Sequence, residues 1–136
     1  MLAGLDDIGR TMRNGENYMG GLDALLPRPT NTATILLSHI PAPSLVENAA
    51  VRGVDLMLSG HMHGGQIWPF SYLVKREFPH LVGAHKAGDM ALVISRGAGS
   101  WGPRMRLWQP GEIFKLTLRS AQAPGAGAPP ARAIAQ

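Results

Sequence analysis

The fold is decided by the stretch Val54-Asp55-Leu56-Met57-Leu58-Ser59-Gly60-His61-Met62-His63-Gly64-Gly65-Gln66. Its apolar run, residues 54–58, ends abruptly at a Ser-Gly turn, which is typical of a buried strand. His61 and His63 follow one residue apart, and on extended backbone such side chains point to the same side. Histidine is the commonest metal ligand in proteins, and glycines let the backbone turn sharply beside a ligand. The pattern predicts a strand that delivers two imidazoles to a metal site.

A second unit of the same kind lies upstream, where residues 34–39 form another β-branched and aliphatic run. Between the two runs, Ser44 stands at the start of a capping box and Gly53 closes the helix that it predicts. Strand, helix and strand make a βαβ unit with parallel strands, so the fold class is α/β. Ligands of open α/β sheets bind beyond the carboxyl ends of the strands. The imidazoles expected to converge at that edge are those of His39, His61 and His63.

The rest of the chain has weaker patterns. Residues 18–26 predict a short helix, and residues 90–94 and 113–118 predict two further strands. Residues 67–88 have no clean period and are expected to form a long loop beside the site. His80 and His85 fall in that loop, where we take them as isolated residues without a role in metal binding.

Composition limits the function classes. The 136 residues make one domain at most, which we place at residues 1–119, followed by an Ala/Pro/Gly-rich tail, residues 120–136, expected to be disordered. The chain has no cysteine, which excludes disulfides and thiolate metal sites. No apolar run approaches the ~20 residues that span a bilayer, and no signal peptide pattern is present. We expect a cytoplasmic or membrane-peripheral protein.

Basic residues outnumber acidic ones, and the net charge is +4. They are spread along the chain rather than clustered, so no specific nucleic-acid binding is expected. The densest group near the predicted site is Arg96, Arg104 and Arg106, of which Arg104 is the candidate for a phosphate contact. Residues 97–102 match the glycine pattern of dinucleotide-binding loops, but Pro103 follows where a helix would have to open. A glycine-rich loop beside the metal edge fits better.

Two segments carry a resemblance to a known family: residues 35–41, Ile-Leu-Leu-Ser-His-Ile-Pro, and residues 58–66, Leu-Ser-Gly-His-Met-His-Gly-Gly-Gln. They resemble the calcineurin-like metallophosphoesterases. The Gly-Gly-Gln extension, with residues 95–99, is similar to a bacterial subfamily with membrane-associated and lipid-pyrophosphatase members. The resemblance spans residues 2–118 and implies the C-terminal portion of such a domain. The implied fold is half of a four-layer αββα sandwich, with a βαβ core and additional C-terminal strands.

The resemblance implies a hydrolase that cleaves a phosphate ester or pyrophosphate with metal-activated water. His39 and His61 would bind one divalent ion and His63 the other, and Mn, Fe or Zn would suit these ligands. Arg104 would contact the substrate. The implied partners are a phosphorylated small molecule or a lipid, with peripheral membrane association.

The sequence also departs from the family. Its Asp-x-His, Gly-Asp-x-x-Asp and Gly-Asn-His elements do not occur here, so the bridging carboxylate is missing. Asp55 stands at the far end of its strand from the histidines. Two functions therefore stay open. The first is a phosphoesterase whose missing half is supplied by another chain, as in a split enzyme, or was lost by truncation or from the gene model. The second is a non-catalytic remnant with a vestigial three-histidine site.

Overall fold

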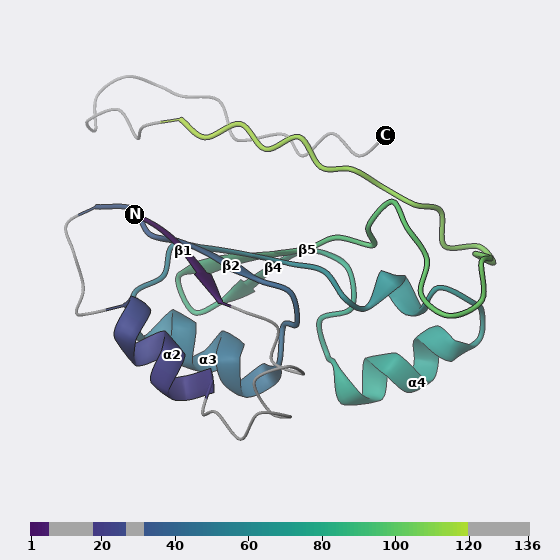
Figure 1. Ribbon diagram of the computed structural model, residues 1–136, viewed down its shortest axis with the longest axis horizontal. Helices are drawn as coiled ribbons and strands as arrows, with labels where there is room; N and C mark the ends of the chain where they lie inside the picture. The colour runs from purple at the N-terminus through teal and green to yellow at the C-terminus, as the bar shows by residue number, and fades with distance from the viewer. Residues whose placement is uncertain (6–17, 27–31, 120–136) are drawn as a thin grey trace.

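Five strands form one mixed sheet in the order β1-β2-β3-β5-β4 (Figure 1). The computed structural model describes residues 1–5, 18–26 and 32–119, and every structural statement below refers to these. The strands are β1 (Leu2–Leu5), β2 (Ile35–Ser38), β3 (Leu56–Ser59), β4 (Gly83–Ala87) and β5 (Met90–Ile94). The first three and β5 are parallel, and β4 pairs antiparallel with β5 at one edge. The expected α/β fold is confirmed.

The helices α2 (Tyr18–Leu25) and α3 (Pro43–Val51) lie on one side of the sheet (Figure 1). Because side chains alternate along a strand, one residue in two points at these helices. The side chains of this core that are almost completely buried are Leu22, Leu36, Leu45, Met57, Met90, Leu92 and Ile94. Burial of one such side chain contributes about 1.5–3 kcal/mol. This layer holds the parallel strands, and therefore their carboxyl ends, in fixed positions.

The other face of the sheet is also apolar but is left open by these helices. Leu37 on β2 is 39% exposed, and its neighbours on this face, Ile35, Leu56, Leu58 and Val93, are partly exposed. One helical layer on one sheet is the arrangement expected for part of a metallophosphoesterase domain. No helix among the described residues is long and apolar enough to cross a bilayer.

The expected capping box at Ser44 is wrong. Helix α3 begins one residue earlier, at Pro43, with Ala42 as its N-cap and no side-chain cap. Proline has its backbone dihedral preset for the first turn and has no N–H that needs a partner there, so it can begin a helix without a capping side chain. The Ser44 carbonyl instead accepts a hydrogen bond from the side chain of Asn48, at 2.7 Å.

The expected loop over residues 67–88 is also wrong, because it contains helix α4 (Phe70–Glu77) and strand β4. No residue of α4 is buried, and its apolar face consists of Phe70 and Val74, one turn apart, which is too short a pattern to mark a helix in the sequence. Residues 113–118 do not form the expected strand. They pass along the side of the sheet opposite α2 and α3 without pairing with a strand (Figure 1). The expected tail at residues 120–136 lies outside the described residues.

Candidate metal centre

Two of the three candidate imidazoles meet at the carboxyl ends of neighbouring parallel strands. His39 follows β2 and His61 follows β3, and the Gly60 N–H donates to the His39 carbonyl at 3.1 Å. The His39 Nε2 lies 3.1 Å from the His61 Nδ1, with the rings edge to face and their centroids 4.9 Å apart. The topology predicted this contact, because parallel strands in register bring their ends together.

The geometry of this pair fits two ligands of one metal ion. Zinc–imidazole bonds of 2.0–2.1 Å in a tetrahedral site separate two ligand nitrogens by about 3.3 Å. The observed 3.1 Å is close to that value, and both rings are exposed enough to be reached from solvent. Without an ion, one ring N–H donates to the other ring's lone pair. Either state keeps the two nitrogens facing each other.

The described residues do not complete the ligand set. Within residues 1–5, 18–26 and 32–119, no three His, Cys, Asp or Glu side chains come together as a metal site. Asp55 lies at the opposite end of β3, where its carboxylate accepts the Thr34 N–H at 2.7 Å. The chain described here therefore supplies two imidazoles of a centre but no carboxylate to balance the charge of an ion.

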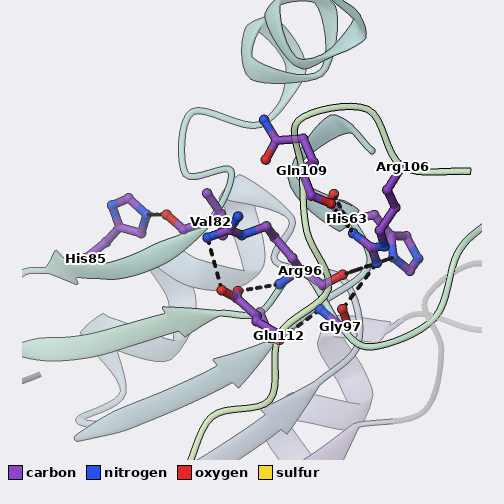
Figure 2. Close-up of polar contacts among 9 residues, drawn as sticks. His63, Val82, His85, Arg96, Gly97, Arg106, Gln109 and Glu112 are labelled. Carbon is purple, nitrogen blue, oxygen red and sulfur yellow. Dashed lines mark hydrogen bonds and ion pairs between the residues drawn. The ribbon is translucent and has the colours of Figure 1, made fainter. Parts of the chain in front are cut away.

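His63 does not join the other two imidazoles, contrary to the expected convergence. The same-side argument assumed extended backbone, whereas His61 and His63 have φ angles of 69° and 48°. Its Nδ1 lies 3.1 Å from the Arg96 carbonyl and also 3.1 Å from the Arg106 guanidinium (Figure 2). A carbonyl only accepts and a guanidinium only donates. In the tautomer with the proton on Nδ1, Nδ1–H donates to the Arg96 carbonyl and Nε2 keeps the lone pair that a metal requires; in the other tautomer, Nδ1 accepts from the Arg106 guanidinium.

The turn that carries these histidines is strained. His61, His63 and Gln66 all have positive φ, a backbone region that residues other than glycine rarely adopt. Between them, a Cβ on Gly65 would lie 2.4 Å from the Ser71 Cα, so η1 (His63–Gly65) packs directly against α4. Strained residues of this kind gather at functional sites, where the surrounding structure holds them in place. The backbone strain therefore marks this turn as a candidate functional site, independently of the metal-binding chemistry of the imidazoles.

An ion pair fixes the loop that meets His63. The Arg96 guanidinium lies 3.2 Å from the Glu112 carboxylate, which also accepts the Arg96 N–H at 2.8 Å (Figure 2). The Glu112 N–H in turn donates to the Gly97 carbonyl at 3.0 Å. The Glu112 side chain is only 14% exposed, so the pair is largely shielded from water. The glycine-rich loop thus lies beside His63, as expected, and opens no helix.

Arg106, which the sequence grouped with Arg96 and Arg104 but did not favour, is the arginine that contacts the loop beside His63. Its guanidinium donates to the carbonyls of Arg96 at 2.9 Å, Gly97 at 3.2 Å, Gln109 at 3.2 Å and Gly99 at 3.0 Å. Arg104, the expected phosphate contact, is exposed, and no hydrogen bond or ion pair holds it among the described residues. Residues 104 and 106 lie in a segment without helix or strand, where no periodic pattern indicates which side chain points inward. The sequence therefore could not distinguish the two arginines.

His80 and His85, expected to be isolated, lie together away from this site. Their ring centroids are 4.6 Å apart, and His85 Nε2 lies 3.0 Å from the Val82 carbonyl (Figure 2). Burial, and then the charge of His85, lower the pKa of His80 below its ordinary value. They form a second imidazole pair at the edge strand β4.

Comparison with known proteins agrees with the resemblance in the sequence. The chain is 39% identical over 124 residues to an uncharacterized metallophosphoesterase of Campylobacter jejuni, an alignment that covers 83% of this chain and 33% of that protein. It is 42% identical over 110 residues to one of Helicobacter pylori, covering 78% and 29%. It is 35% identical over 125 residues to a transmembrane protein with metallophosphoesterase domain of Bos taurus, covering 88% and 28%.

The chain thus spans about a third of the length of these relatives. No family model matches it. No solved structure matches it significantly. The aligned part nevertheless includes most of this chain, and the sequence identity is 35% or more with both the bacterial and the animal relatives named above. Over most of its length, this chain is therefore a homologue of the metallophosphoesterases.

Proposed function

We propose that this chain forms part of a metal-dependent phosphoesterase, in which His39 and His61 hold one divalent ion and His63 holds a second. The observation that carries the proposal is the 3.1 Å contact between His39 and His61 at the carboxyl edge of the sheet. A divalent ion bound there would lower the pKa of a bound water and stabilise charge on phosphate oxygens. Mn, Fe and Zn all accept imidazole ligands.

The protein's own residues prepare this edge for a metal and a phosphate. In the tautomer with its proton on Nδ1, the His63 ring is oriented by donating to the Arg96 carbonyl, and Nε2 is left for an ion. Arg104 is exposed and without a partner among the described residues, so its guanidinium can meet a phosphate from solvent. The substrate class is a phosphorylated small molecule or lipid, with peripheral attachment to a membrane in the second case.

We place the missing carboxylate ligands outside the described residues, and in particular on a segment of a longer form of the polypeptide or of another chain. Three neutral imidazoles cannot balance two divalent ions, and the described residues bring no carboxylate to the pair. The relatives are much longer than the aligned part, which leaves room for such a segment. The second candidate function is a non-catalytic remnant, which the incomplete ligand set favours.

The test measures metal bound per chain and hydrolysis of a chromogenic phosphodiester with Mn²⁺. Wild type is compared with His39→Ala, His61→Ala and His63→Ala, and with His85→Ala as a histidine control away from the site. We expect His39→Ala and His61→Ala to lose bound metal and His85→Ala to retain it. Equal metal binding in all variants would contradict the proposed centre. Metal binding without hydrolysis, even when the upstream region of a longer relative is added, would favour the remnant.

A further inference from the structure

An apolar cavity opens beside the candidate metal centre. It lies between α4 and the loop at residues 101–103 and has a volume of about 450 Å³. His61 and His63 line one part of it. The turn residues Met62, Gly65 and Gln66 also line it, and the other lining residues are Ile67, Phe70, Val74, Phe78, Trp101 and Pro103. A mostly apolar cavity of this size with a few polar groups at one end is typical of a small-molecule site.

Hydrogen bonds of Gln66 connect the histidine turn to the loop at residues 101–103. The side chain of Gln66 is buried, and its amide spans from the histidine turn to the opposite wall. Its Nε2 donates to the carbonyls of Trp101 at 2.7 Å and Pro103 at 3.1 Å, and its Oε1 accepts the Trp101 N–H at 2.7 Å. The Leu107 N–H donates to the Gln66 carbonyl at 3.0 Å. The wall is therefore fixed by the fold, although Trp101 itself is 76% exposed.

The lining of the cavity combines two kinds of side chain. The imidazoles of His61 and His63 can carry a metal ion or contact an anion, whereas most of the other lining side chains are apolar. Among the described residues, no Asp, Glu, Lys or Arg side chain lines it. A ligand that matches this lining carries an anionic group and an apolar chain. A compact sugar or nucleotide phosphate would leave apolar walls in contact with water and would gain nothing from them.

We propose that this cavity binds the apolar chain of a phosphate ester whose phosphate lies at His61 and His63. The placement of the phosphate rests on the proposed function, whereas the binding of the ligand's apolar chain rests on the cavity alone. The cavity therefore selects amphiphilic esters over compact ones. Each methylene that enters it strengthens binding about fourfold until the cavity is full.

The test measures binding of n-alkyl phosphates of increasing length to the complete chain, without metal, through tryptophan emission, since Trp101 lines the cavity. The dissociation constant is expected to fall about fourfold per methylene. Val74→Asp places a charge in the cavity and should abolish this dependence. Leu73→Asp is the matched control, because Leu73 is its neighbour on α4, is 66% exposed and does not line the cavity. No residue of α4 is buried, so both variants should keep the fold, as circular dichroism will show.

The outcomes separate this inference from the proposed function. Chain-length dependence that only Val74→Asp removes supports the cavity, even where no hydrolysis is found. Binding that does not depend on chain length, or equal losses in the two variants, overturns it. A second arm uses vesicles of phosphatidic acid. If the protein sediments with vesicles and this depends on Val74, the ligand is a membrane lipid. If the protein binds only soluble alkyl phosphates, the ligand is a soluble ester.

Discussion

Replacement of Arg106 by alanine should weaken the whole region around His63. The guanidinium donates hydrogen bonds to carbonyls of Arg96, Gly97, Gly99 and Gln109. Hydrogen bonds to a charged group contribute about 1.5–3 kcal/mol each. These bonds share one partly exposed side chain, and water replaces some of them, so their contributions do not add. We therefore expect a loss of about 2 kcal/mol in the free energy of unfolding.

Urea unfolding followed by circular dichroism measures this loss. With a slope of about 2 kcal/mol per molar urea, the midpoint should fall by about 1 M. Arg104→Ala is the control. Arg104 lies two positions before Arg106, carries the same charge and is exposed, so its removal should change the free energy of unfolding by no more than about 0.5 kcal/mol. Arg106→Lys keeps the charge but loses the planar fork and should recover about half of the loss.

Hydrogen exchange gives a local reading of the same change. The Glu112 amide donates to the Gly97 carbonyl, so its protection should fall in Arg106→Ala and stay unchanged in Arg104→Ala. If the two alanine variants unfold at the same urea concentration and protect this amide equally, the guanidinium network does not hold the loop, and the reasoning is refuted.

Two further predictions concern the turn and the edge strand. Gly65→Ala should destabilise the fold by several kcal/mol more than Gly53→Ala in urea unfolding, because both positions have positive φ but only a Cβ at Gly65 meets backbone, at Ser71; equal effects would contradict the close packing of η1 on α4. The pKa of His80 is lowered by burial and by His85, so its neutral form is favoured in the folded state. Stability from this residue is full above the ordinary value of about 6.5 and is lost as the pH falls through the lowered pKa. The melting temperature should fall more in wild type than in His80→Asn between about pH 7.5 and 5.5, and parallel curves would oppose this assignment.

The part of the fold that could be predicted rests on local patterns. Two apolar runs with a helix between them specify a parallel pair, and the pair alone brings His39 to His61. The position of His63 could not be derived this way, because it depends on a turn with positive φ that the period of a strand does not describe.

The remaining errors have physical causes of the same kind. Helix α4 was missed because it is short, and its apolar face of Phe70 and Val74, one turn apart, is too small a pattern to mark a helix. The alternation in residues 113–118 is real, but a strand also needs a neighbour, and none pairs with it among the described residues. Gln66 bonds to backbone 35 positions away and Arg106 to backbone 10 positions away, which no local pattern describes.

The order of strands in the sheet has a consequence for the way the chain folds. Among the described strands, the β4–β5 hairpin is the pair that joins near neighbours, whereas the parallel pairs join distant positions such as 35 with 56 and 56 with 91. Distant pairings close large loops and form late, so the hairpin should nucleate and the parallel strands should add to it. The contact between His39 and His61 exists only once β2 has paired with β3. In kinetic experiments, the metal affinity proposed for this pair would therefore be gained after most of the secondary structure, as a late signal that the sheet is complete.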